Sequence, residues 1–231
     1  MNPSKLTEFQ LLIRLMKPFF QRRSCLIPTF RGWLCIGLLA VVVAVGTVRN
    51  LHSFLAVTDP VEGGVLVIEG WAPDYAFETA IAEFHRHPYD QLYVTGGPIE
   101  RGAILTEYQT YAGLGEAILR RMGMTSAQAV PAPVARKDRT YLSAIALRDL
   151  WHREGKSVQK INLISMGPHS RRSRLLFEKA FGPQVRVGVL AVEDREYDPA
   201  QWWKSSHGFR SVTDELIAYG YAKFIFSSES L

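Results

Sequence analysis

The sequence predicts an α/β protein: a parallel sheet with helices on both faces, preceded by one N-terminal transmembrane helix. The first observation is that short apolar runs alternate with longer segments of helical periodicity, as in repeated strand–helix units. The second is an uncharged stretch near the N-terminus, from Gly32 to Val48. The third is size, since 231 residues at 47% hydrophobic composition are enough for one domain with its own core.

The uncharged stretch is interpreted as a membrane anchor. At about 1.5 Å per residue it is roughly 25 Å long, near the lower limit for crossing a bilayer. Trp33 at one end suits the membrane interface, and Arg31 and Arg49 can extend outward from the two ends. A cleaved signal peptide and a buried core helix fit less well, because the preceding segment is long and the stretch has no polar face. The expected organisation is a basic cytoplasmic tail (1–31), an anchor (32–48), a linker (49–63) and one domain (64–231).

Charge placement predicts the orientation of the anchor. Six basic residues and one acidic residue precede Gly32, whereas residues 50–231 are close to neutral. By the positive-inside rule the N-terminus stays in the cytoplasm, and the domain lies on the outer side of the cytoplasmic membrane. Residues 1–31 either form an amphipathic helix on the inner membrane surface or are a loosely ordered tail. A near-neutral domain lacks the basic footprint of a nucleic-acid-binding protein.

The first half of the domain contains two buried strands and two helices. Residues 64–69 form an apolar run, and Pro73 and Asp74 then begin a helix with an apolar stripe through Phe77. Residues 91–95 predict the second strand, which Gly96 and Gly97 terminate. A helix over about 105–122 follows, and Gly123 ends it. Residues 129–134 contain two prolines and therefore predict at most an edge strand.

The second half repeats the pattern. Asp138 and Thr140 are candidate caps for the third helix. Residues 160–165 and 185–190 predict two further strands, with a helix over 169–181 between them and a last helix over about 211–226. Trp202 and Trp203 lie in a long connection before that helix. This connection is either a loop pinned to the domain or a membrane-facing or lid-like patch.

Polar residues gather where the predicted parallel strands end. Because all these carboxyl ends meet at one edge of the sheet, we expect one pocket there. The candidate residues follow the first, second and fourth strands or begin the third helix: Glu69, Gly70, Trp71, Thr95, Gly96, Gly97, Arg139, Thr140, Ser165, His169, Arg171 and Arg172.

Two of these residues are candidates for catalysis. An imidazole such as His169 can move protons near neutral pH, and Glu69 is placed to act as a general base or cation ligand. Arg171 and Arg172, beside a helix N-terminus, can bind an anion, and the arginines outweigh the single carboxylate. The alternatives are a surface histidine beside solvated arginines, an Arg139–Asp138 salt bridge, and Thr140 as a plain cap. If the site residues are exposed, His169→Ala and Arg172→Ala should leave the thermal midpoint nearly unchanged.

Three motifs in order resemble the SanA/ElyC/YdcF family of bacterial envelope proteins. They are Thr95-Gly96-Gly97, the helix start Arg139-Thr140-x-x-x-Ala144, and Ser165-x-x-x-His169-x-x-Arg172 after a strand. The resemblance covers roughly residues 64–226. Ser143 stands where the family usually has Asn, Ser173 stands where it has Ala, and the family's acidic residue matches Glu107 only loosely, as in a divergent branch. The resemblance implies a Rossmann-like domain involved in envelope integrity, peptidoglycan or lipid-carrier metabolism.

Two classes of function therefore remain open. The first is an envelope enzyme that acts on a phosphate-bearing, nucleotide-like or lipid-linked substrate through Glu69 or His169. The second is a non-catalytic, membrane-anchored binding or scaffold module; a YdcF-type member would bind S-adenosylmethionine. The sequence assigns no cofactor, since it contains no Walker loop and no Gly-x-Gly-x-x-Gly fingerprint. It predicts no metal site, because His85 and His87 lack a matching third ligand.

Overall fold

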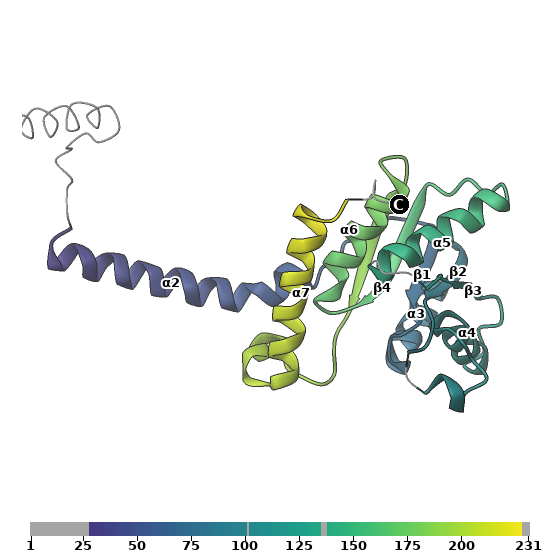
Figure 1. The fold of residues 1–231 in the computed structure, drawn as a ribbon, viewed down its shortest axis with the longest axis horizontal. Coiled ribbons are helices and arrows are strands. Elements are labelled where there is room, and N and C mark those ends of the chain that lie inside the picture. Colours follow the sequence, from purple (N-terminus) through teal and green to yellow (C-terminus); the bar gives the residue numbers. More distant parts are fainter. Residues whose placement is uncertain (1–27, 101, 135–137, 228–231) are drawn as a thin grey trace, which may run out of the picture. The chain divides into compact units, whose positions relative to one another are not determined.

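The computed structural model describes residues 28–100, 102–134 and 138–227 (Figure 1). The chain divides into two compact units, Met1–Val45 and Gly46–Leu231. Most of the tail, for which an amphipathic helix was one expectation, lies outside the described residues. Helix α2 (Phe30–Leu55) contains the predicted anchor, and by length and composition it is able to span a membrane. The helix continues through residues 49–55, which were expected to form a linker. These residues belong to the second unit, where Leu51 and Leu55 pack in an apolar cluster with Trp202 and Val212.

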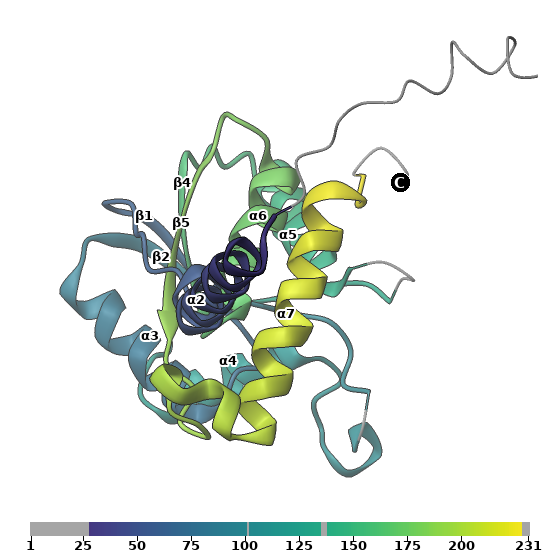
Figure 2. The same ribbon diagram turned by 90° about the vertical axis from the view of Figure 1, so that its left-hand side faces the viewer.

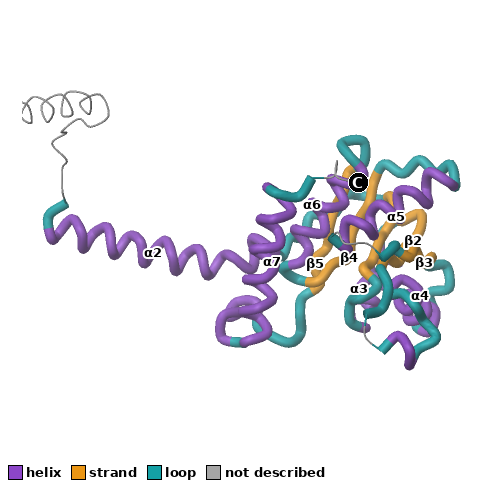
Figure 3. Tube along the Cα trace, viewed as in Figure 1, coloured by secondary structure: helices purple, strands orange, loops and turns teal. Residues whose placement is uncertain are grey.

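The sheet has five parallel strands in the order β3-β2-β1-β4-β5, which confirms the predicted α/β class (Figure 3). The strands are β1 (Gly64–Glu69), β2 (Tyr89–Gly96), β3 (Gln128–Pro131), β4 (Lys160–Met166) and β5 (Arg186–Val192). Strand β3 is short, lies at one edge and ends in proline, as expected for an edge strand. The arrangement is Rossmann-like.

Helices cover both faces of the sheet, and each face has its own core. Helices α3 (Asp74–Arg86) and α4 (Tyr111–Arg121) pack with Leu66 and Ile68 of β1. Helices α5 (Arg139–Arg153) and α6 (His169–Phe181) pack with Val65 and Val67 of the same strand. Helix α7 (Ser206–Phe224) lies against α6 (Figure 2). The side-chain alternation of a strand that is buried on both faces therefore produces the two layers.

Two helix starts differ from the prediction because capping residues set them. Helix α4 begins at Tyr111, since the Thr110 hydroxyl accepts a hydrogen bond from the Gly113 N–H at 3.1 Å; only a short 3₁₀ turn, η1 (Ala103–Leu105), precedes it. Helix α7 begins at Ser206, and the Ser205 hydroxyl accepts from the Gly208 N–H at 3.3 Å.

The tryptophan-containing connection is a 3₁₀ segment, η2 (Pro199–Lys204), that is fixed to the domain. Trp202 is 3% exposed, and its indole N–H donates to the carbonyl of Val48 at 3.1 Å. This arrangement matches a connection pinned to the domain rather than a lid.

The strand order creates a crevice at the middle of the sheet. The chain builds β1, β2 and β3 toward one edge, then crosses through α5 to place β4 on the other side of β1. The carboxyl ends of β1 and β4 therefore lie at a topological switch point, where α/β sheets usually bind ligands. Glu69 ends β1 and Ser165 lies near the end of β4.

Candidate functional site

A cavity of about 590 Å³ lies at the carboxyl ends of β1 and β2 and the starts of α5 and α6. Eight of the residues predicted from the sequence as catalytic or ligand-binding line it: Glu69, Thr95, Gly96, Gly97, Arg139, Thr140, His169 and Arg172. Trp71, Pro98, Tyr111, Asp138, Ser143 and Glu215 complete the lining. The structure therefore brings together predicted residues that lie up to 103 positions apart in the sequence, from Glu69 to Arg172.

Glu69 forms the floor of this cavity and is almost fully buried. Its Oε2 accepts a hydrogen bond from the Ser165 hydroxyl at 2.6 Å, and its Oε1 accepts from the Ser173 hydroxyl at 3.1 Å. Burial alone would raise the pKa of this carboxyl, but the nearby His169 and the two hydroxyl donors outweigh it and lower the pKa. Glu69 is therefore ionised, and Ser165 acts on the site through it.

His169 lies between two carboxylates. Its Nε2 is 3.2 Å from Glu69 Oε1, and its Nδ1 is 2.8 Å from Glu215 Oε1. Burial disfavours the charged ring, but the two carboxylates more than compensate and raise the pKa of His169 to about 9. At neutral pH the ring is therefore an imidazolium, which can donate a proton but is not available as a base.

Arg172 connects this histidine to the start of α5. It forms a bidentate pair with Glu215, with Nε–Oε2 and Nη2–Oε1 distances of 2.8 and 3.0 Å, and its Nη1 donates to Asp138 Oδ2 at 3.0 Å. The other oxygen of Asp138 caps α5 by accepting from the Thr140 and Tyr141 N–H groups. We call Glu69, Asp138, His169, Arg172 and Glu215 the buried charge network.

The network corrects the expectation that the site residues are exposed. The side chains of His169 and Arg172 are only 10% and 14% exposed, and each has two acidic partners. Truncating His169 to alanine leaves Glu69, and truncating Arg172 leaves Asp138, as a buried carboxylate without its counter-charge. The premise of exposed site residues is therefore wrong, and we now expect both variants to lower the thermal midpoint. Those two substitutions do not separate a functional role from a structural one.

The network also changes the charge balance of the pocket, because it contains three carboxylates rather than one. Sequence reasoning treated Asp138 as a cap or as a partner of Arg139, and it missed Glu215. A signal for Glu215 exists: it lies in line with Val212, Tyr219 and Ala222, which face the core at helical spacing. An acidic residue in such an apolar stripe needs a buried cationic partner.

Two polar groups at the pocket have no buried partner. The Arg139 guanidinium bonds to Glu100 at 2.9 Å, but both side chains are exposed, at 73% and 66%. The Thr95 hydroxyl is buried and has no hydrogen-bond partner among the described residues. Thr140 Oγ1 is 3.5 Å from His169 Nε2, so Thr140 lines the cavity while Asp138 provides the cap. A ligand can satisfy the first two groups without breaking a buried interaction.

The three predicted glycines have different roles. An added Cβ at Gly70 would lie 2.3 Å from the Tyr111 carbonyl oxygen, and one at Gly96 would lie 2.8 Å from the Ala112 nitrogen. Both glycines therefore allow the start of α4 to approach the strand ends. At Gly97 an added Cβ would meet no described atom within 4 Å. Gly97 is the glycine that leaves room for a ligand.

Two residues singled out from the sequence lie elsewhere. Arg171 does not line the cavity: its Nε donates to the carbonyl of Phe54, and its guanidinium lies 4.1 Å from the centre of the Phe54 ring. Glu107 is exposed and is not among the lining residues. Trp71, 43% exposed, packs its ring edge-on against His169 with the centroids 5.1 Å apart. It thus forms part of the pocket wall.

A second cavity, of about 670 Å³, lies beyond that wall and shares Trp71, His169 and Glu215 with the first. Its outer part contains another histidine between two carboxylates: His207 Nε2 is 3.0 Å from Asp194 Oδ2, and Nδ1 is 3.3 Å from Glu196 Oε2. Among the described residues, no group of three or more His, Cys, Asp or Glu side chains is arranged to hold a metal ion.

Comparison with known proteins adds no further identification. No protein-family model, curated protein or solved structure matches this chain.

Proposed function

We propose that this protein is a membrane-anchored component of the bacterial cell envelope whose Rossmann-like domain binds an anionic, phosphate-bearing or nucleotide-like ligand in the 590 Å³ cavity. The observation that carries the proposal is the pair of groups left for a ligand, the Thr95 hydroxyl and the Arg139 guanidinium. A phosphate oxygen accepts hydrogen bonds from both types of group, and arginine binds it in a bidentate way.

The buried charge network supports this proposal. Five ionisable residues from several elements converge below the cavity, and burying that many charges gives little net stability. Such clusters with shifted pKa values are typical of functional sites. The network pairs each of its two cations with two carboxylates, so Arg139, whose partner Glu100 is exposed, is the lining cation most available to a ligand.

The anchor and the charge distribution support the proposed location. Helix α2 is able to cross a bilayer, and the basic residues that precede it favour a cytoplasmic N-terminus. The domain then lies outside the cytoplasmic membrane, in keeping with the resemblance to envelope proteins. A reporter that is active only after export, fused after Leu231, should be active; activity of a cytoplasm-only reporter there would contradict the orientation.

Turnover of the ligand is a second candidate function, and the protonation state of His169 favours it. The imidazolium at the wall of the cavity has two N–H groups, one facing Glu215 through Nδ1 and one facing Glu69 through Nε2, so transfer of the Nε2 proton to a leaving group replaces the bond to Glu69. Glu69 keeps the Ser165 and Ser173 hydroxyls as donors in that exchange. Glu215 would then hold and orient the ring through Nδ1. A non-catalytic protein would bind the same ligand without converting it.

Ligand-induced thermal stabilisation of the full chain in detergent tests the binding proposal. Inorganic phosphate, a nucleoside monophosphate, a nucleoside diphosphate and S-adenosylmethionine serve as probes. We expect a phosphate-bearing probe to raise the thermal midpoint. Arg139→Gln should weaken its binding about 10- to 100-fold, the usual value of a hydrogen bond to a charged group. A turnover assay on any probe that binds then separates the two candidates.

Arg153→Gln is the matched control, because Arg153 is an exposed arginine near the other end of the same helix. It should leave binding unchanged. If no phosphate-bearing probe stabilises the protein, or if Arg139→Gln and Arg153→Gln bind equally well, the proposed site is wrong. Stabilisation by S-adenosylmethionine alone would replace the proposed ligand with that one.

A further inference from the structure

The outward face of α7 is apolar. Its exposed large hydrophobic residues are Phe209 (52%), Leu216 (39%), Ile217 (71%), Tyr221 (49%) and Phe224 (79%). They recur at spacings of three, four and seven to eight residues, so they lie along one side of the helix. We call them the α7 stripe. The intervening Thr213 donates its hydroxyl to the carbonyl of Phe209 at 2.7 Å. The exposed Arg210 and Asp214 lie on the same side of the helix, and both also line the second cavity.

This face is not the one that packs on the domain. Val212 and Ala222 are fully buried, and Glu215 bonds to Arg172 and His169 in the buried charge network. A surface helix of a soluble domain normally places polar residues opposite its buried face. Helix α7 instead has five large apolar residues there, interrupted by Arg210 and Asp214, and a group of exposed apolar side chains of this kind marks an interaction site.

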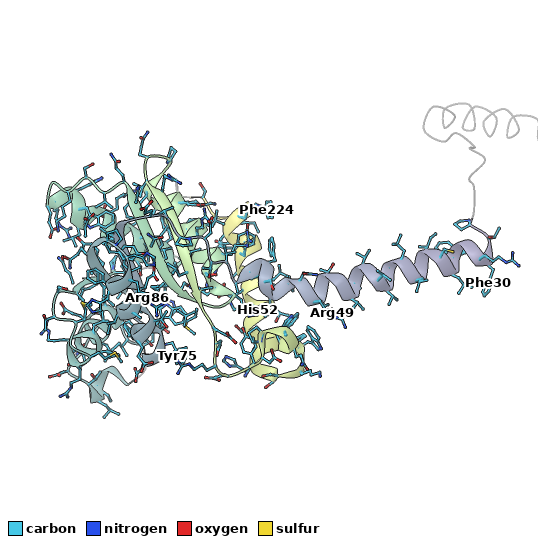
Figure 4. All side chains as sticks on the ribbon, turned by 180° about the vertical axis from the view of Figure 1, so that it is seen from behind. Phe30, Arg49, His52, Tyr75, Arg86 and Phe224 are labelled. Atoms are coloured by element: carbon cyan, nitrogen blue, oxygen red, sulfur yellow. The ribbon has the colours of Figure 1, made fainter. Side chains whose placement is uncertain are left out.

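The stripe lies beside the point where the anchor helix joins the domain. Leu51 and Leu55 of α2 pack with Val212 and Tyr219 of α7, and the rings of Phe54 and Tyr219 are 5.9 Å apart. Figure 4 shows Arg49 and His52 on these last turns of α2 and Phe224 on α7. Because a membrane anchor must leave the bilayer close to this point, the neighbouring surface of α7 is within reach of the lipid.

The residues around the stripe suit the layer between lipid and water. Lys223 Nζ lies 5.5 Å from the centre of the Phe224 ring and 5.7 Å from that of Tyr219, and Arg171 lies over Phe54. Long basic side chains beside aromatic rings are typical of interfacial segments, where the charged ends reach the head groups. A soluble protein partner would not require this continuity with a membrane anchor.

We propose that the α7 stripe binds to the surface of the bilayer that α2 spans, so that the domain is held at the membrane by α7 in addition to its anchor. The proposal depends on the membrane-spanning role of α2 but not on the ligand of the pocket. It gives α7 two functions, since its inner face supplies Glu215 to the pocket and its outer face contacts lipid.

Site-specific fluorescence on the full chain tests this contact. In a Cys25→Ser, Cys35→Ser background, single cysteines at Ile217→Cys, Val42→Cys and His152→Cys carry an environment-sensitive fluorophore. The labelled protein is reconstituted into phosphatidylethanolamine–phosphatidylglycerol vesicles that contain a nitroxide-labelled lipid. Val42 reports insertion of α2, and His152, exposed near the end of α5, reports a surface of the domain away from α7. We expect strong quenching at positions 42 and 217 and several-fold weaker quenching at 152.

The outcomes separate the possibilities. Quenching at position 42 with none at 217 would refute the α7 contact and leave the anchor intact. Equal quenching at 217 and 152 would also refute it. A shielded probe at 217 that lipid does not quench, and whose signal changes with the protein-to-lipid ratio, would assign the stripe to a second copy of the chain. If Ile217→Cys does not fold, Phe224→Cys tests the same face, and absence of quenching there overturns the proposal.

Discussion

Two histidines of this protein lie between pairs of carboxylates, and their surroundings differ. His169 is 10% exposed, and its partners Glu69 and Glu215 are 5% and 18% exposed. His207 is 41% exposed, and its partners Asp194 and Glu196 are 16% and 70% exposed. The bond distances are similar, from 2.8 to 3.2 Å around His169 and 3.0 to 3.3 Å around His207.

Similar geometry therefore gives unequal interactions, and burial makes the difference. Water and salt screen an exposed pair, so that its net contribution is usually small. In the interior the same charges interact strongly, but they also lose their hydration. Around His169 the attraction wins, because every carboxylate has more than one donor: Glu69 accepts from two hydroxyls and Glu215 from Arg172. The first cluster is a fixed part of the pocket, and the second is a surface arrangement.

The largest expected effect comes from removing the buried cation that has the most partners. Arg172→Met leaves Asp138 and Glu215 without their shared guanidinium, and both are at least four-fifths buried. Breaking a buried pair in this way costs about 3–5 kcal/mol. Chemical denaturation of the full chain in detergent should show this loss in the free energy of unfolding.

Arg174→Met is the matched control on the same helix. Arg174 pairs with Asp59 and Glu178, whose side chains are 65% and 44% exposed. Its loss should therefore change the free energy of unfolding by no more than about 1 kcal/mol. Equal losses in the two variants would show that burial does not distinguish these ion pairs.

The sequence was most informative about the sheet and its carboxyl edge. Each strand is a short apolar run, and the apolar character alone predicts a strand buried on both faces. Helix α6 begins at His169 and ends at Phe181 as expected, because Gly182, at φ 72°, terminates it. Helix α4 was predicted too long, since Leu105 continues an apolar periodicity although Thr110 provides the cap.

The site was only partly predictable for a physical reason. Residues that follow strands share one edge of the sheet, so Glu69, Thr95 and His169 could be grouped from their positions alone. Glu215 comes from a helix after the last strand, and nothing local places that helix against α6. Arg171 was placed in the site for a different reason, because it is adjacent to Arg172 in the sequence. Successive residues of a helix point about 100° apart, so Arg171 faces Phe54 and not the cavity.

The second-largest expected effect is the pH dependence of the free energy of unfolding, which depends on the buried His169. The pKa of His169 is raised from 6.5 to about 9, so its stabilising contribution is complete below pH 6.5 and is lost as the pH rises through 9. The pKa of Glu215 is lowered from 4.5 to about 2, so its contribution is present above pH 4.5 and is lost as the pH falls through 2. We expect maximal stability between these two windows.

His169→Gln tests the assignment of the alkaline window. The slope of the unfolding free energy between pH 6.5 and 9, at most about 1.4 kcal/mol per pH unit for one proton, should be much smaller in this variant than in the parent chain. His207→Gln is the matched control and should retain the slope. If His207→Gln removes the slope and His169→Gln retains it, the buried cluster is not the source of the pH dependence.

The smallest expected effect belongs to the exposed cluster itself. His207→Gln removes the contacts with Asp194 and Glu196, which are partly open to water and salt, so the free energy of unfolding should change by less than about 1 kcal/mol. Raising the salt concentration from about 0.1 M to 1 M shortens the screening length from about 10 Å to 3 Å. The difference between the parent chain and His207→Gln, measured by denaturation at the two salt concentrations, should therefore shrink, whereas the difference for His169→Gln should persist. A salt-independent loss in His207→Gln as large as that in His169→Gln would mean that partial exposure does not weaken the second cluster.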